Sequence, residues 1–127
     1  MAHRAFRLVV LAAFAVAVAD PTAGAPPPTI TITLDNYAFD PAPITLAAGQ
    51  PVRLAFVNRS GRGHDFTAPA FFASAQILAG AAPRGKVDVA AGSSITLDLI
   101  PAKGQYKVHC AKFTHGMRGM KTKIVVQ

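Results

Sequence analysis

The sequence predicts an all-β sandwich of seven to eight strands with one short helix. Several short segments alternate apolar and polar residues and are rich in β-branched side chains, which is typical of half-buried strands. These segments recur at intervals of about ten residues and are separated by glycine and proline, as in sandwich folds. We find neither an internal repeat nor a composition shift that marks a second domain, so we expect one folded domain over residues 29–127.

The elements can be placed in order along the chain. Residues 29–34 alternate strictly and form the clearest strand, and residues 35–41 are expected to turn. Residues 69–80 carry large apolar side chains near helical spacing, and the short helix is expected within this stretch. The other strands are expected at residues 44–47, 51–57, 64–67, 85–90, 94–100, 104–110 and 124–127.

The first nineteen residues predict a signal peptide. Arg4 and Arg7 precede the uncharged apolar run 8–19, which is too short to span a membrane. Small residues favour cleavage before Asp20 over a second site after Ala25, because proline would follow that second cut. Residues 20–28 are rich in proline and alanine and are expected to form a flexible leader. We therefore expect a periplasmic protein with no membrane span once the signal is removed.

The charge of the chain indicates the kind of partner. Once Arg4 and Arg7 are removed, eleven of the thirteen lysines and arginines remain against six acidic residues, a net charge of +5. The basic residues are scattered along the sequence and form no run, which argues against nucleic-acid binding. A moderate positive charge instead predicts a protein partner with an acidic docking face.

Cys110 is the one cysteine of the chain and cannot form an internal disulfide. In an oxidising compartment such a thiol pairs with another chain, reacts, or binds a metal. It is followed by His115 and by two thioethers, Met117 and Met120. A loop can fold such residues around one point, whereas a strand spaces them about 3.3 Å apart. A thiolate, imidazoles and a weak thioether are the donors of blue-copper sites, so we predict one mononuclear copper ion.

The second imidazole must come from elsewhere in the chain. His3 leaves with the signal peptide, and His109 points away from Cys110 because adjacent strand residues face opposite sides. His64, after an apolar strand and a turn, is the remaining candidate. We expect His109 to be a surface residue, and a sharper hypothesis makes it an exit for electrons beside Lys107.

The C-terminal stretch has the pattern Tyr106-x-Val-x-Cys110-x4-His115-Gly-Met-Arg-Gly-Met120-x3-Ile124-Val-Val. This pattern resembles the copper loop and last strand of the cupredoxins. The spacing of its ligands is similar to that of rusticyanin and the phytocyanins. This resemblance implies a Greek-key β-sandwich and one type 1 copper ion that cycles between Cu(I) and Cu(II) to carry single electrons. It implies His64, Cys110 and His115 as equatorial ligands and Met120 as the weak axial ligand, with Met117 as the substitute if the loop folds differently.

One residue departs from the pattern of the family. Its members often carry asparagine directly after the first histidine, where it braces the ligand loop, and here the residue is Asp65. A carboxylate at this position is expected to lower the reduction potential unless it is neutralised or turned away, because charges near a metal tune it.

Three function classes follow from these residues. The leading hypothesis is a small monomeric electron carrier that exchanges electrons at the His115 edge with a cytochrome or a copper oxidase or reductase, at rates that fall as salt rises. A periplasmic copper chaperone or store with the same ligands is the alternative, although the chain is not rich in methionine. An enzyme is not expected: copper oxidases and nitrite reductases need further histidine pairs, and no oxyanion-hole signature accompanies Cys110.

Overall fold

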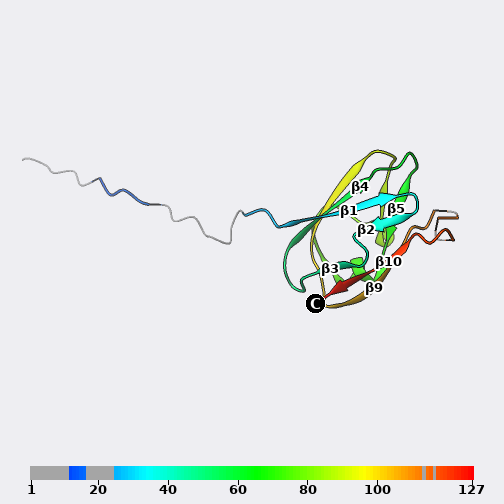
Figure 1. The fold of residues 1–127 in the computed structure, drawn as a ribbon. Helices are drawn as coiled ribbons and strands as arrows, with labels where there is room; N and C mark the ends of the chain where they lie inside the picture. Colours follow the sequence, from blue (N-terminus) through cyan, green and yellow to red (C-terminus); the bar gives the residue numbers. More distant parts are fainter. Residues whose placement is uncertain (1–11, 17–24, 113, 116) are drawn as a thin grey trace, which may run out of the picture.

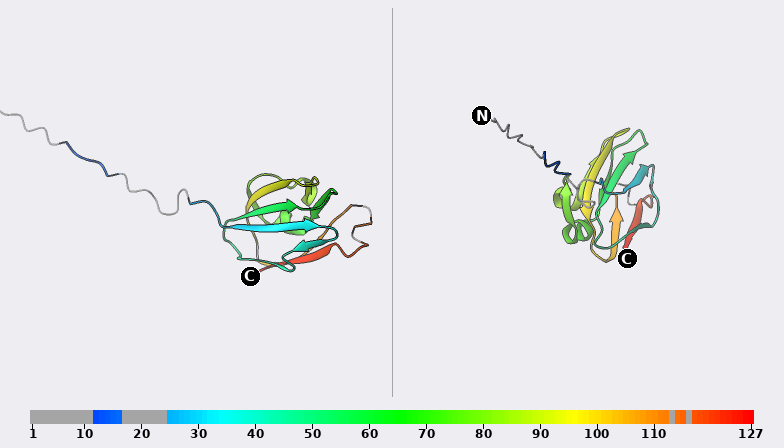
Figure 2. Two further views of the ribbon diagram at one scale, coloured as in Figure 1. Left: turned by 45° about the horizontal axis from the view of Figure 1, so that its top comes forward. Right: turned by 90° about the vertical axis from the view of Figure 1, so that its left-hand side faces the viewer.

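The computed structural model describes residues 12–16, 25–112, 114–115 and 117–127. From Thr29 onward the described residues build two five-stranded sheets packed face to face (Figures 1 and 2). The all-β sandwich with one short helix is confirmed. The elements are β1 (Thr29–Asp35), β2 (Ala38–Asp40), β3 (Ile44–Leu46), β4 (Val52–Asn58), β5 (His64–Thr67), α1 (Pro69–Ser74), β6 (Gln76–Ala79), η1 (Pro83–Gly85), β7 (Lys86–Val89), β8 (Ser94–Ile100), β9 (Gly104–His109) and β10 (Lys121–Val126).

The described residues hold ten strands where the sequence pattern predicts seven to eight. One extra strand is β2, which lies inside the expected turn and pairs with the end of β1. The other is β6, which follows α1 within residues 69–80, so this stretch contains the expected short helix in its first half and an unexpected strand in its second half. A further helical turn would add little stability on its own, whereas residues 76–79 form backbone hydrogen bonds with β8 when they are extended.

Both sheets mix parallel and antiparallel neighbours. The first has the order β2-β1-β4-β8-β6 and the second the order β3-β10-β9-β5-β7. The strands β1 and β4 are parallel, as are β3 and β10, and the other pairs are antiparallel. The chain therefore passes repeatedly from one sheet to the other.

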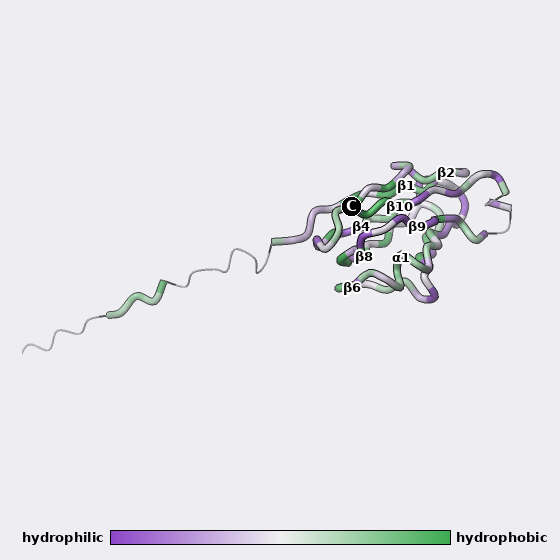
Figure 3. Tube along the Cα trace, turned by 90° about the horizontal axis from the view of Figure 1, so that it is seen from below, coloured by the Kyte–Doolittle hydropathy of each residue, from purple (hydrophilic) through white to green (hydrophobic). Residues whose placement is uncertain are grey.

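The core lies between the sheets and follows from the alternation of the sequence. In β4 every second residue is buried, because successive side chains of a strand point to opposite faces. Phe66 of β5 is fully buried and packs edge-on against Phe39 and in a tilted contact against Phe56, with ring centroids 5.6 and 4.9 Å away. In Figure 3 hydrophobic stretches accordingly lie along the strands of the sandwich.

The segments that surround the expected ligands lie together at one end of the sandwich. They are the turn after β1, the loop between β4 and β5, and the segment between β9 and β10, whereas the C-terminus lies at the opposite end (Figure 1). The first residue of β5 thus supplies His64, and the segment between β9 and β10 supplies the other expected ligands.

The N-terminal prediction stays a prediction. Residues 12–16 are exposed and have no regular secondary structure, and they stand out as a hydrophobic stretch in Figure 3. The rest of the expected signal peptide and its cleavage site before Asp20 lie outside the described residues. Within the described part of the chain, no helix has the length and apolar character needed to cross a membrane.

Replacing Leu54 by alanine tests the core. Leu54 is fully buried, so the substitution is expected to lower the free energy of unfolding by about 2 to 5 kcal/mol, through lost burial and a residual cavity. Leu78→Ala is the matched control, because the side chain of Leu78 is 48% exposed and its loss should cost less than about 1 kcal/mol. Urea unfolding of the metal-free variants measures both values, and equal losses would contradict this packing.

Candidate metal centre

The loop before β5 fixes the position of His64. Asn58, at the end of β4, is buried, and its amide nitrogen donates hydrogen bonds to the carbonyl oxygens of Arg62 at 2.7 Å and Val89 at 2.9 Å. Its amide oxygen accepts a hydrogen bond from the backbone N–H of Ser60 at 3.0 Å. These bonds close the loop, so the first residue of β5, His64, enters the interior with its side chain fully buried.

Cys110 follows directly after β9 and points into the sandwich. It lies on the same face of the chain as Val108, and both are buried, whereas His109 between them is exposed. The backbone N–H of Cys110 donates to the carbonyl oxygen of Met120 at 3.1 Å, which holds the two ends of the ligand segment together. The structure therefore places His109 on the outside, as the alternation of the strand predicts.

Backbone hydrogen bonds turn the chain at His115. Its N–H donates to the carbonyl oxygen of Lys112, and its own carbonyl oxygen accepts from the N–H groups of Arg118 and Met120, each at 3.1 Å. The chain is thereby directed back into β10. The side chain of His115 is brought beside Cys110 and is 8% exposed, so it reaches the surface only at one edge.

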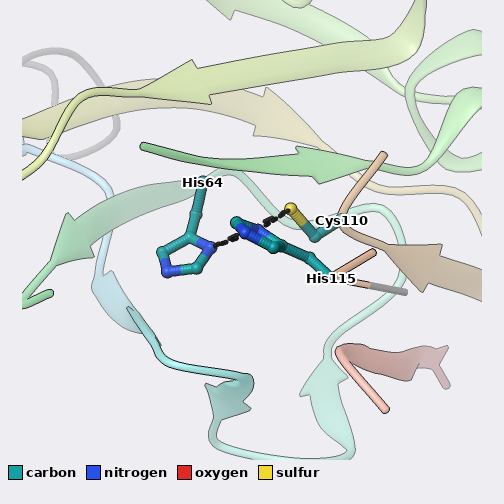
Figure 4. A group of neighbouring side chains, drawn as sticks. All are labelled: His64, Cys110 and His115. Atoms are coloured by element: carbon teal, nitrogen blue, oxygen red, sulfur yellow. Dashed lines mark hydrogen bonds between the residues drawn. The ribbon is translucent and has the colours of Figure 1, made fainter. Parts of the chain in front are cut away.

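Three ligand atoms converge at this end of the sandwich (Figure 4). The Nδ1 atoms of His64 and His115 are 3.1 Å apart, and the sulfur of Cys110 lies 3.5 Å from Nδ1 of His115 and 4.0 Å from Nδ1 of His64. Bonds from zinc to nitrogen and sulfur are about 2.0 and 2.3 Å long, so donors in a trigonal plane lie roughly 3.5 to 3.7 Å apart. The triangle therefore fits one ion of this size, and its sulfur and nitrogen donors suit copper.

The two methionines of the segment have different surroundings. Met120 is fully buried, and its backbone is hydrogen-bonded to both Cys110 and His115. Met117 is 86% exposed. A thioether that completes a buried site has to lie in the interior, so the burial favours Met120 over Met117 as the axial ligand.

Asp65 joins the two strands that carry the ligands. Its Oδ1 atom accepts hydrogen bonds from the backbone N–H of Ala111 at 2.8 Å and from the hydroxyl of Thr67 at 2.6 Å. Its own backbone N–H points at the sulfur of Cys110, at 3.5 Å. The carboxylate thus braces the ligand segment by accepting hydrogen bonds, as an asparagine side chain at this position can also do.

Asn36 is a residue of the site that the sequence did not reveal. Its Oδ1 atom lies 2.9 Å from Nε2 of His64. Because an amide oxygen can only accept, Nε2 carries the proton and Nδ1 keeps its lone pair toward the cluster. No local pattern indicates this role, because the turn that holds Asn36 meets His64 only in the folded chain.

Tyr37 and Arg118 cover the two histidines. The ring of Tyr37 lies edge-on to His115 and His64, with centroids 5.1 and 6.2 Å away. The guanidinium of Arg118 lies 4.9 Å from the centre of the tyrosine ring, a cation–π contact. This stack shields the imidazole side of the site and ties the turn after β1 to the ligand segment.

The environment shifts the pKa values of two donors in opposite directions. Burial lowers the pKa of His64, and repulsion from His115 lowers it further, so the imidazole is held neutral. Burial raises the pKa of the Cys110 thiol, against the opposing effect of nearby backbone N–H groups. Metal binding must therefore displace a proton from the sulfur, while His64 already offers its lone pair.

The fold and the donor set define a small mononuclear copper protein. The chain matches the family model of the cupredoxin-like domain over residues 8–126, and it belongs to this family. The family and the donor set together assign one copper ion to the site. No curated protein matches the sequence.

Several solved structures share the fold. Auracyanin B is similar over 82% of this chain and 91% of its own, with 23% identity and a TM-score of 0.58. Reduced auracyanin from the photosynthetic bacterium Roseiflexus castenholzii is similar over 78% and 96%, with 24% identity and a TM-score of 0.59. The multicopper oxidase of Campylobacter jejuni is similar over 86% of this chain but only 32% of its own, with 12% identity and a TM-score of 0.63. At these identities the likeness concerns the fold.

Replacing Asn36 by alanine tests the orientation of His64. The substitution removes the acceptor for Nε2–H, and we expect the affinity for copper to fall by about 10- to 100-fold, as when partners of ligand histidines are lost elsewhere. Competition with a chelator measures the affinity. Asn36→Asp keeps an acceptor oxygen and serves as the control, and an equal loss in both variants would mean that the hydrogen bond does not orient the ring.

Proposed function

We propose that this protein is an exported carrier of single electrons, with copper held by His64, Cys110 and His115 and with Met120 as the axial ligand. The observation that carries the proposal is the convergence of one sulfur and two imidazole nitrogens in the interior of a cupredoxin sandwich. Bound copper supplies a one-electron couple between Cu(I) and Cu(II). The chain supplies a fixed set of donors.

The donors are held by the fold in a way that suits electron exchange. His64 and Cys110 are anchored on adjacent strands, and His115 is anchored by three backbone hydrogen bonds. A site fixed in this manner changes little between oxidation states. Fast exchange with a partner requires this property.

Burial favours a carrier over an enzyme. His64, Cys110 and Met120 are at most 1% exposed, and His115 reaches the surface at one edge only. A substrate cannot approach donors enclosed in this way, whereas an electron can leave through a ligand edge. The multicopper oxidases share the fold, but the chain has four histidines in all, and two of them belong to this site.

A copper chaperone or store is the second candidate. The observation in its favour is the exposed thioether of Met117, a soft donor beside the site that could meet incoming Cu(I). Burial of the other donors disfavours rapid release of the ion. The colour of the copper(II) form separates the two functions.

Location and partner are part of the same proposal. The pattern of residues 1–19 supports export to the periplasm, where a protein of this charge meets redox proteins such as a cytochrome or a copper oxidase or reductase. The net positive charge supports a partner with an acidic docking face and a monomeric carrier. Exchange between the two proteins should slow as salt rises.

The visible spectrum of the copper(II) protein tests the function. We expect a strong blue or green thiolate-to-copper band that disappears in Cys110→Ser, because the serine oxygen replaces the sulfur donor. Met117→Leu is the control and should keep the band. A colourless protein that takes up copper only as Cu(I) would identify the chaperone or store instead.

Exchanging the two methionines for glutamine tests the axial ligand. Met120→Gln should shift the copper absorption and the electron paramagnetic resonance parameters and lower the reduction potential, because an oxygen donor favours Cu(II). Met117→Gln should leave both unchanged, since this side chain lies mostly in solvent. The opposite pattern would assign the axial position to Met117.

Replacing Asp65 by asparagine tests the effect of its charge. The amide oxygen can accept the hydrogen bonds from Ala111 and Thr67, so the brace is kept while a negative charge is removed. The reduction potential should rise, by about 59 mV for each 1.4 kcal/mol of lost stabilisation of the oxidised site. Voltammetry measures the shift, and an unchanged potential would show that the charge is screened from the copper.

A further inference from the structure

The outer face of β9 and β10 gathers basic side chains that are separated in the sequence. Lys107 and His109 point outward from β9, and Lys121 and Lys123 point outward from β10, all four of them exposed. The strands pair in a register that sets Lys123 opposite Lys107 and Lys121 opposite His109. Side chains opposed in this way have Cβ atoms about 4.5 to 5.5 Å apart. We call these four residues the lysine face.

No described carboxylate neutralises this face. In the part of the chain that the structure describes, the ion pairs are Arg53–Asp98, Lys86–Asp88 and Lys112–Asp88, and none of them includes a residue of the lysine face. Like charges directly opposite one another destabilise an antiparallel pair. The stability of the fold therefore does not account for the arrangement, and an external anionic partner would relieve it.

The lysine face lies directly behind the metal centre. His109 directly precedes Cys110, and Lys121 directly follows Met120. Cys110 and Met120 face the interior, and their neighbours His109 and Lys121 therefore face outward. Lys107, His109 and Lys121 also line a surface hollow of about 390 Å³, together with Val108 and Thr122. A protein docked on this face would contact the residue joined to Cys110 by one peptide bond.

We propose that the lysine face is the docking surface for an acidic redox protein. This inference rests on the proposed function and names the surface that its partner uses. One electron passes between the two docked proteins, from whichever is reduced to the one that is oxidised, and no bond or proton is transferred. A redox protein docked beside Cys110 has a short path for electron transfer, whereas a lipid surface or a nucleic acid has no use for this path. The position of the lysine face next to the site therefore favours a redox protein as its partner.

Mapping of an acidic probe tests the surface without electron transfer. The probe is a decaglutamate peptide, added to the copper(I)-loaded protein, whose amide resonances are followed by NMR. We expect the largest shift changes in residues 105–109 and 121–125 and an affinity that falls with salt. In the triple variant Lys107→Gln, Lys121→Gln, Lys123→Gln the affinity should fall at least about fivefold.

A control variant separates the lysine face from net charge. Arg59→Gln, Arg84→Gln and Lys103→Gln remove the same charge from exposed positions that lie outside this face. Their combined effect on the affinity should stay below about twofold. Equal losses in both triple variants, or shift changes centred elsewhere, would overturn the proposal. If phosphatidylglycerol vesicles bind more tightly than the peptide, and the lysine-face variant loses this binding, the proposal is overturned and the face binds a membrane.

Electron exchange with charged oxidants adds the functional readout. Oxidation of the reduced protein by the anion hexacyanoferrate(III) should slow in the lysine-face variant and keep its rate in the control variant, while oxidation by the cation tris(phenanthroline)cobalt(III) should not slow in either. An unchanged rate with the anion would contradict docking next to the site. If the protein lacks the thiolate-to-copper band, the proposed function fails, and the peptide mapping still decides whether the surface binds acidic proteins.

Discussion

The metal centre depends on the contact of β5 with the end of β9 and with the residues that follow it. These strands pair through a single residue pair, Thr67 and His109, although they supply two of the three converging donors. The bond from the Ala111 N–H to the carboxylate of Asp65 extends this short connection past the end of the ladder. Without it, the distance between His64 and Cys110 would be set by a strand end that is free to fray. The departure from asparagine therefore keeps the mechanical role of the residue and adds a charge.

Burial of the donors creates a second requirement, because imidazole and thiol groups lose hydration in an apolar interior. Each buried polar group needs a partner, and within the described residues no buried side-chain nitrogen or oxygen lacks one. Asn36 supplies the partner of His64 on one side, and the donor cluster supplies it on the other. The hydrogen bond to Asn36 can remain when an ion binds and orients the ring of His64, whereas bonds to the ion replace the contact between the two Nδ1 atoms.

Residue patterns with a short period were readable from the sequence, and long-range contacts were not. Alternation predicted the strands, and the spacing of donors after Cys110 pointed to the ligand segment. The short helix was expected within residues 69–80, but its end at Ser74 and the strand after it were not readable, because apolar residues in a short run do not distinguish a helix from an edge strand. Asn36 and the stack of Tyr37 on Arg118 were missed because they act across strands, and no local pattern encodes their partners.

The alternation of inward and outward side chains along β9 links the metal centre to the surface behind it. Cys110 faces inward and His109 outward because they are neighbours on one strand, and the register with β10 then fixes which lysines stand beside His109. A slip of one residue would turn the sulfur into solvent and the imidazole into the core. The buried apolar side chains of β9 and β10 prevent that slip, since it would expose Val108 and Ile124. The packing of the core therefore holds both the ligand and the basic surface in place, and the register brings together basic residues that are separated in the sequence.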